Sequence, residues 1–351
     1  MHIQHCEVAA RVVRGNGVEA VHTASIVVVN ADKRITHAFG DPHLQTFTRS
    51  SIKPFQALPL VTSGAADRFK LTEKELAIAC GSHNGTDDHK LTAESILAKA
   101  GNRPEHLQCG CHWPAYMRMK NIYPLGDEDR DPSRNNCSGK HAGFLAVARH
   151  LDADVATYLE PDSPVQVAVR RGLGEALECD IEAAPRGVDG CSAPNYAVPL
   201  YHLALGFLKL ATATEGPLAR IAAAMRAYPE MVSGKDRFDL ALAQTFPSNV
   251  VSKVGAEAVQ GIAFRDPALA LVVKTHDGAT RALNPICVEA LRQLGLLKSA
   301  AGTPLEKYAR PQVTNHRGTL TGEIVAEFEL KAKAKAAGLP VGVESTAGER
   351  L

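Results

Sequence analysis

The sequence predicts an α+β fold in which strands from both ends of the chain form an antiparallel sheet. Short runs rich in β-branched and apolar residues lie within the first 40 residues and return after about residue 250. The long middle of the chain is instead predicted to be helical. Strand-rich ends around a helix-rich middle favour one sheet packed with helices, together with a mostly helical insertion.

The N-terminal part is predicted to contain strands over 7–15, 24–30 and 35–40. The polar turn ADKR separates the last two runs and predicts a hairpin. A helix is expected to follow over 54–64.

The middle of the chain is predicted to hold a series of helices. One of them begins with Asp162 and Ser163 followed by Pro164, a pattern that predicts an N-cap and then proline at the first helical position. The predicted helical segments are 72–80, 86–101, 139–151, 163–177, 193–212 and 216–229.

Strand patterns return in the C-terminal part, where His276, Asp277 and Gly278 indicate a hairpin turn. The Lys- and Ala-rich tail from Lys331 is predicted to be a frayed helix or disordered. The predicted strands are 259–266, the run starting at 269, and 319–330, with a helix over 284–297.

These elements predict a single folded unit over 5–330. Its α/β part comprises 5–60 and about 250–330, its mostly helical part spans about 61–249, and 331–351 form a C-terminal tail.

Charge and hydropathy exclude several classes of function. A formal net charge of +1 over 351 residues gives no electrostatic basis for binding nucleic acid or a membrane surface. The apolar runs are too short or too interrupted to cross a bilayer, and the first residues lack the layout of a signal peptide. We therefore expect a cytoplasmic protein with neither a nucleic-acid nor a membrane partner.

The eight cysteines are scattered along the chain, so a disulfide framework is not expected and most should be buried free thiols. Cys109 and Cys111 are closer together, but they lack CxxC spacing and are weak evidence for a metal site.

The segment RSSIKPFQ at 49–56 places two serines before a lysine. In a helical turn Ser50 and Lys53 share a face, whereas Ser51 points away. A Ser-x-x-Lys pair is typical of serine acyl-transfer enzymes, although a match this short is expected by chance. Pro54 disfavours helical geometry at Lys53, so the turn is expected to be a tight, non-ideal entry to the following helix.

Three polar loops contain further candidates, but each also has a simpler structural interpretation. GSHNG at 81–85 places Ser82 and His83 after an apolar helix, where a C-cap and turn is the favoured interpretation. NNCSGKHAG at 135–143 and GVDGCSAPNY at 187–196 carry Cys137 and Cys191. The two thiolates could converge on zinc with a further ligand, but two unrelated small residues are favoured on these segments alone.

Two lysines near the C-terminus give weaker signals. Lys253 precedes Gly255 in a segment where a surface lysine in a loop is the simplest interpretation. Lys274 invites comparison with the Lys-Thr-Gly strand of penicillin-recognising enzymes, but His276 replaces the glycine, so Lys274 is not expected to be catalytic.

Taken together, eight segments in this order resemble the asparaginase II family, the rhizobial type of L-asparaginase. They are RSSIKP, CGSHNG, CGCHWP, NNCSGKHAG, DGCSAP, YPEMVSG, SKVGAE and VKTHDGATRAL. The resemblance covers about residues 5–330, which it implies to be a single catalytic unit. It also implies a fold similar to serine β-lactamases and related glutaminases, in agreement with the predicted α+β class.

The resemblance implies two Ser-Lys pairs, Ser50 with Lys53 and Ser82 with Lys253. The implied activity is hydrolysis of the side-chain amide of L-asparagine to L-aspartate and ammonia. Our sequence hypothesis is that Ser50, activated by Lys53, is the nucleophile, while Ser82 and Lys253 relay protons or act as a second base. The two pairs could exchange these roles. A lysine acts as a base only when neutral, which requires burial or neighbouring cations to lower its pKa.

The resemblance also implies one zinc ion per chain, a substrate pocket and a homodimer. The implied zinc ligands are Cys137, Lys140 and Cys191, completed by water. The implied pocket residues are Arg49, Asp189 and His141. Because two thiolates leave zinc with little Lewis acidity, we expect the metal to bind or orient substrate rather than to carry out hydrolysis.

Two alternatives remain open at this stage. The chain could be a glutaminase or another serine amidohydrolase of β-lactamase-like fold, since asparagine and glutamine differ by one methylene. It could also be a zinc-stabilised binding protein without catalytic activity.

Overall fold

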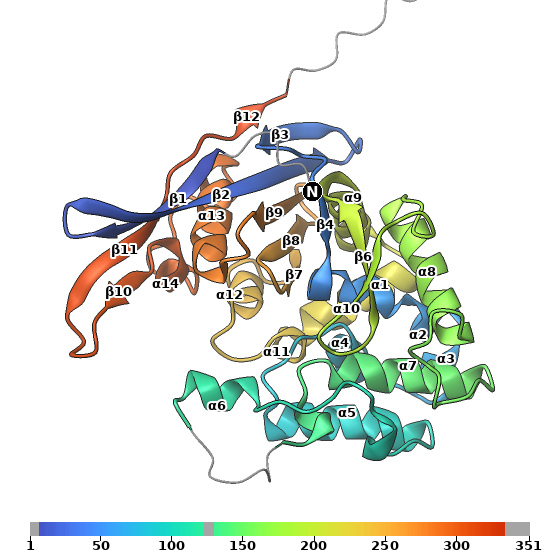
Figure 1. Cartoon of the computed structure of the whole chain (residues 1–351). Coiled ribbons are helices and arrows are strands. Elements are labelled where there is room, and N and C mark those ends of the chain that lie inside the picture. The colour runs from blue at the N-terminus through green and yellow to red at the C-terminus, as the bar shows by residue number, and fades with distance from the viewer. Residues whose placement is uncertain (1–6, 123–129, 334–351) are drawn as a thin grey trace, which may run out of the picture.

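A large antiparallel sheet with helices around it forms the framework of the protein (Figure 1). The computed structural model describes residues 7–122 and 130–333. Strand β2 (Gly17–Asn30) pairs antiparallel with β1 (Val8–Arg14), β3 (Ile35–Phe39) and β9 (Leu269–Thr275). N-terminal and C-terminal strands therefore lie side by side, which confirms the predicted α+β class.

The strand order of the sheet is β10-β11-β1-β2-β9-β8-β7, and β3 carries the short strand β12 on its outer side. On β1 the pairing with β11 places Val12 opposite Ile324. The remaining strands are β7 (Val250–Gly255), β8 (Val259–Phe264), β10 (Gln312–Thr314), β11 (Leu320–Ala326) and β12 (Lys331–Ala332).

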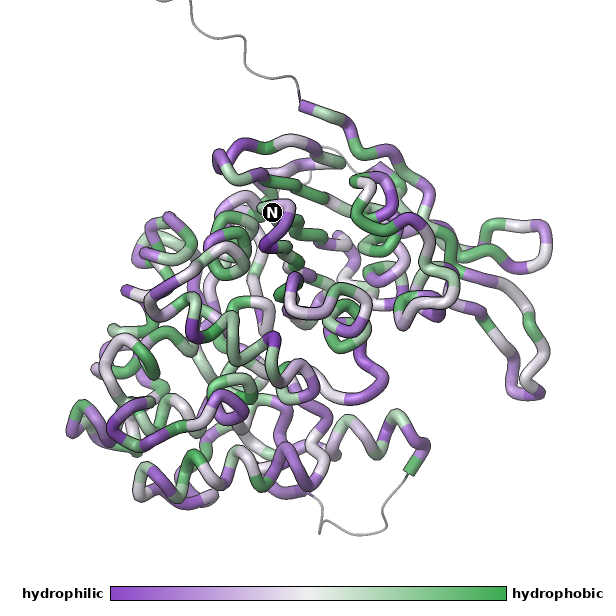
Figure 2. Tube along the Cα trace, turned by 180° about the vertical axis from the view of Figure 1, so that it is seen from behind, coloured by the Kyte–Doolittle hydropathy of each residue, from purple (hydrophilic) through white to green (hydrophobic). Residues whose placement is uncertain are grey.

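Helices cover both faces of the central strands. Helix α9 (Leu200–Thr212) packs on β2, β8 and β9 from one side, and α13 (Thr280–Gln293) packs on β9, β11 and β1 from the other. Side chains alternate between the faces of a strand, so the run Ile26–Val29 contributes to both cores and all four residues are buried. Figure 2 shows hydrophobic residues along these central strands and hydrophilic residues mainly on the outer loops.

The middle of the chain forms a helical layer beside this sheet, as predicted. Helix α4 (Glu73–Ala79) packs against both α5 (Asp87–Lys99) and α7 (Ser138–His150), which also pack against each other. The expected N-cap of α8 (Pro164–Leu177) is confirmed, because the Ser163 side chain accepts a hydrogen bond from the Gln166 N–H. The other helices are α1 (Lys53–Gln56), α2 (Leu58–Thr62), α3 (Ala65–Arg68), α6 (Ala115–Met119), α10 (Gly216–Ala227), α11 (Pro229–Val232), α12 (Phe238–Thr245) and α14 (Glu306–Ala309).

A small second sheet corrects one prediction in this region. The helix expected from residue 193 begins only at Leu200, because Pro194–Pro199 form strand β6 between β4 (Gln45–Phe47) and β5 (Arg186–Val188). Backbone hydrogen bonding to these two partners outweighs the apolar pattern that favoured a longer helix.

Three C-terminal predictions are also corrected. Lys253 lies within strand β7 rather than in a loop. The turn at 276–278 leads from β9 into α13, which begins at Thr280, whereas the β8–β9 hairpin turns at 265–268. Lys331 and Ala332 pair with β3 as a strand, and the predicted tail beyond 333 lies outside the described residues.

Among the helices of the described ranges, none combines the length and the apolar character that crossing a membrane requires.

The packing of α9 on β8 depends on a glycine. A Cβ built at Gly261 would lie 2.1 Å from Cε2 of Phe207, a buried ring that in turn packs edge-on against Phe55. We expect Gly261→Ala to lower the free energy of unfolding by about 1–3 kcal/mol, because the fully buried ring would have to shift against its packing with Phe55. Urea denaturation measures this change. Gly17→Ala, at an exposed position with no close neighbour, should change it by less than about 0.5 kcal/mol, and equal effects would contradict the packing argument.

Candidate active site

Three segments far apart in sequence meet around the side chain of Ser82. Ser82 follows the C-terminal end of α4, Lys53 is the first residue of α1, and Lys253 lies in β7. Nζ of Lys53 and Nζ of Lys253 each lie 2.9 Å from Ser82 Oγ. All three side chains are buried, so a single hydroxyl is held between two amines that bulk water does not reach.

The Lys53 amine has acceptors for all three protons of an ammonium group. Besides Ser82 Oγ, it donates to the backbone carbonyls of Gly81 and Asn136, the latter at 3.2 Å. Three donors directed at three acceptors match a charged lysine. The geometry therefore places a positive charge beside the Ser82 oxygen.

The Lys253 amine is arranged differently. It has two partners, the Val254 carbonyl at 2.7 Å and Ser82 Oγ at 2.9 Å. Burial lowers its pKa to about 7, with the positive charges of Lys53 and Arg237 acting in the same direction and Asp239 opposing them. A neutral amine in this position can donate to Val254 and accept the Ser82 proton through its lone pair.

The structure separates Ser50 from the pairing expected for it. Ser50 lies in a 3-10 turn, Arg49–Ile52, and is half-buried. Within the described ranges its hydroxyl makes no hydrogen bond, and Lys53 turns instead toward Ser82. Ser51 points away as expected, because its hydroxyl is buried and donates to the Thr48 carbonyl at 2.6 Å.

A second buried cluster contains the predicted zinc ligands. Lys140 Nζ lies 3.0 Å from Cys191 Sγ, and the Cys137 thiol, which donates to Asn136 Oδ1 at 3.5 Å, also interacts with the same sulfur. The interaction with Cys137, together with the charge of Lys140, lowers the pKa of Cys191, whereas the same interaction and burial raise the pKa of Cys137. Burial opposes a charge on Lys140, but the sulfurs of Cys191 and Cys137 outweigh it and raise the lysine pKa.

His141 lies next to this cluster. Its Nδ1 is 2.7 Å from the Tyr158 hydroxyl, while its buried Nε2 has no hydrogen-bond partner among the described residues. Burial lowers the His141 pKa to about 4, so the ring is neutral at physiological pH. A neutral ring with a free nitrogen is suited to accept a proton or to face a ligand.

The other two predicted pocket residues form an ion pair. Arg49 Nε lies 2.8 Å from Asp189 Oδ1, and its NH1 lies 3.8 Å from the exposed Glu257 carboxylate. The Asp189 side chain is 8% exposed. The charge of Arg49 is therefore largely compensated within the protein.

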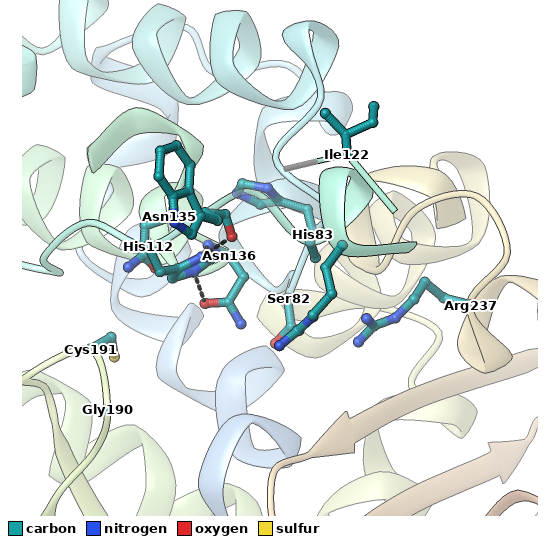
Figure 3. A pocket seen from close by; sticks show the side chains of 12 residues that line it. Ser82, His83, His112, Ile122, Asn135, Asn136, Gly190, Cys191 and Arg237 are labelled. Atoms are coloured by element: carbon teal, nitrogen blue, oxygen red, sulfur yellow. Dashed lines mark hydrogen bonds between the residues drawn. The ribbon is translucent and has the colours of Figure 1, made fainter. Parts of the chain in front are cut away.

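A cavity of about 650 Å³ connects the two clusters, because Ser82 and Cys191 both line it (Figure 3). His112 and Asn136 lie on its wall, joined by a hydrogen bond of 3.2 Å between Nε2 and Oδ1. Arg237 lines the same cavity and was not recognised in the sequence.

A comparison of the sequence with protein families identifies the family of the chain. A family model described as L-asparaginase II matches residues 10–326. The chain belongs to the L-asparaginase II family. This membership supports an amidohydrolase that acts on a small molecule.

Two solved structures are similar to this L-asparaginase II chain at low identity. A β-lactamase from Mycobacterium bovis is 16% identical, with a TM-score of 0.41, over 78% of this chain and 95% of that one. EstCE1, a hydrolase with promiscuous acyltransferase activity, is 12% identical, with a TM-score of 0.34, over 74% of this chain and 90% of that one. No curated protein matches the sequence.

The donor set of this L-asparaginase II chain fits a zinc ion. In the described parts of the chain, no group of three or more His, Cys, Asp and Glu side chains is placed to hold a metal, so a third protein ligand to a zinc ion here would be of another type. Lys140 Nζ, 3.0 Å from Cys191 Sγ, would be such a ligand once its amine has lost a proton. The cysteines of the described ranges are all free, so both thiols are available.

Asp239 is a further residue that the sequence did not reveal. Its buried carboxylate accepts hydrogen bonds from the Ser252 hydroxyl at 2.9 Å, the Gln260 amide at 2.8 Å and the Val254 N–H at 3.1 Å. Because Ser252 and Val254 flank Lys253 on β7, these bonds fix the start of α12 against the strand that presents the lysine. No motif marks this aspartate, and the segment that carries it was not among the predicted helices.

Proposed function

We propose that this protein is an L-asparaginase in which Ser82 is the nucleophile and Lys253 the general base. The observation that carries the proposal is the pair of buried lysine amines, each 2.9 Å from Ser82 Oγ, at the edge of a cavity large enough for an amino acid. A serine hydroxyl is a weak nucleophile until a neighbouring base removes its proton. Family membership supports an amide as the substrate.

The proposed reaction begins when neutral Lys253 takes the Ser82 proton and Oγ bonds to the side-chain amide carbon of asparagine. The Lys253 ammonium returns this proton to the amide nitrogen, the C–N bond breaks, and ammonia leaves. Water then adds to the aspartyl ester as Lys253 accepts its proton, and the ester bond breaks as Lys253 passes that proton to Ser82 Oγ, so that aspartate leaves and neutral Lys253 and free Ser82 are restored. Lys53 stays charged throughout and stabilises the developing negative charge on Oγ.

This proposal exchanges the roles that the sequence hypothesis gave to the two serines. Lys53 directs its amine at Ser82 and away from Ser50, and the half-buried Ser50 hydroxyl lacks a base within hydrogen-bond reach among the described residues. Ser50 remains a candidate for contacting the substrate from the turn that also carries Arg49.

We also propose that Cys137, Lys140 and Cys191 hold one zinc ion, and that Arg49, Asp189 and His141 shape the surrounding pocket. The free Nε2 of His141 and the thiolate character of Cys191 support this assignment. Zinc would supply a positive charge for polar groups of the substrate. The predicted homodimer and the cytoplasmic location stay predictions.

Removing zinc is expected to weaken substrate binding more than catalysis. Dialysis against a chelator should raise KM for asparagine about tenfold or more while kcat changes only a few-fold, because the nucleophile and its base lie outside the metal cluster. Metal content measured by mass spectrometry should be one zinc per chain before dialysis. Loss of kcat at unchanged KM, or purified active protein without metal, would contradict this expectation.

Ammonia release from L-asparagine and L-glutamine tests the proposed function directly. We expect asparagine to be the better substrate by kcat/KM. A preference for glutamine would favour a glutaminase, and turnover of other amides alone would favour a different serine amidohydrolase. Binding of asparagine without any turnover would favour a binding protein.

A further inference from the structure

Arg237 is a half-buried cation at the proposed catalytic centre that has no partner among the described residues. It is the N-cap residue of α12 and lines the same cavity as Ser82. Figure 3 shows its side chain extending toward Ser82. Across the described ranges the guanidinium makes neither a hydrogen bond nor an ion pair. A guanidinium with five unused donors, partly withdrawn from water, is poised to bind an anion.

The charge of the cavity favours an anionic ligand as well. Among the described residues that line it, Arg118 and Arg237 are cations and no Asp or Glu occurs, while the Cys191 thiolate is paired with Lys140. Arg49, the arginine indicated by the sequence, is already paired with Asp189. The charge of Arg237 is therefore not compensated by a described residue, whereas the charge of Arg49 is compensated by Asp189.

The position of Arg237 is fixed by its neighbours in the chain. Two residues later, Asp239 bonds to Ser252 and Val254 on either side of Lys253. The charge of Arg237 is felt at the Lys253 amine, where it contributes to the lowered pKa. The arginine and the proposed base are therefore held by one connected set of contacts.

We propose that Arg237 binds the α-carboxylate of the substrate and is the residue that makes this site specific for amino-acid amides over simple amides. The inference rests on the proposed function, because it requires the amide to be cleaved at Ser82. It adds a subsite: the amide carbon lies at Ser82 Oγ, while the carboxylate at the other end of asparagine lies against the guanidinium of Arg237. Such a pair forms bidentate, charge-assisted hydrogen bonds.

The test compares L-asparagine with β-alaninamide, which is asparagine without its α-carboxylate. Arg237→Met should lower kcat/KM for asparagine on the order of 10- to 100-fold, the value of a charge-assisted hydrogen bond, and leave β-alaninamide within about threefold. Arg237→Lys should recover part of the loss. Arg265→Met, at an exposed arginine outside the cavity, is the matched control and should leave kcat/KM unchanged for both substrates. Thermal unfolding of each variant checks that the fold is retained.

Several results would overturn the inference. If Arg237→Met lowers kcat/KM equally for both substrates and moves the acid limb of the pH profile, the arginine acts only by shifting the pKa of Lys253. If the selective loss appears in Arg118→Met, the exposed arginine on α6 binds the carboxylate. Unchanged kinetics in Arg237→Met would exclude any role.

Calorimetry of asparagine binding separates this inference from the proposed function. The titration uses Ser82→Ala, with and without Arg237→Met. Weaker binding in the double variant supports the carboxylate subsite even if the wild-type protein releases no ammonia. Equal binding in the two proteins overturns the subsite even if asparaginase activity is found, and absence of binding in both overturns the subsite and the proposed substrate together.

Discussion

Ser82→Ala is expected to abolish the acyl-enzyme and to reduce kcat about 10⁴-fold or more. Removing the attacking oxygen leaves the cavity and both lysines in place, so substrate binding should persist while the covalent step is lost. The measurement combines steady-state ammonia release with intact-protein mass after mixing with asparagine or an electrophilic amide analogue. The wild-type protein should show the mass of the adduct, and Ser82→Ala should not.

Ser50→Ala is the matched control for this experiment. It removes a hydroxyl from the neighbouring turn that makes no hydrogen bond within the described ranges, so we expect kcat to fall less than about tenfold. An adduct that persists in Ser82→Ala and disappears in Ser50→Ala would reverse the assignment and restore Ser50 as nucleophile.

Lys253→Met is expected to lower kcat/KM by about 10²- to 10⁴-fold, the range typical for loss of a general base. Methionine retains much of the length of lysine but has no amine to accept the Ser82 proton. The wild-type rate should rise with pH through an apparent pKa of about 7, because the amine is charged and inactive below that pH and neutral above it. In Lys253→Met this rise should disappear.

Lys274→Met provides a comparison in the same sheet, on β9, which is separated from β7 by β8. Lys274 also lies on a central strand and is buried, but its amine donates to the backbone carbonyls of Glu257 and Thr275 and does not contact Ser82. We expect its variant to keep the acid limb of the pH profile. If both variants lose that limb, the titrating group is not Lys253.

The sequence was sufficient for the fold class because the decisive signals are local. β-branched runs at both ends and capped amphipathic segments between them each report on a few adjacent residues. The prediction that residues 193–199 begin a helix was wrong because β6 is stabilised by pairing with β4 and β5, and those partners are distant in sequence.

The same dependence on partners distant in sequence explains why the site was predicted only in part. Spacing alone paired Ser50 with Lys53, yet the acceptors that orient the Lys53 amine come from Gly81, Ser82 and Asn136. The family resemblance indicated two Ser-Lys pairs, but it did not establish which pair supplies the nucleophile. Arg237 escaped notice because what marks it is the lack of a partner, and only three-dimensional contacts reveal that.

The pairing of β2 with β9 has a consequence for how the protein is made. Asn30 lies opposite Leu269, which follows it by 239 positions in the sequence. The C-terminal part of β2, which ends at Asn30, is strongly apolar. At ribosomal rates of about 5–20 residues per second, this segment waits roughly 10–50 s for its partner strand to be synthesised. An exposed apolar strand of this kind is prone to mispairing, so the nascent chain should depend on chaperones, and truncated chains that end before β9 should aggregate.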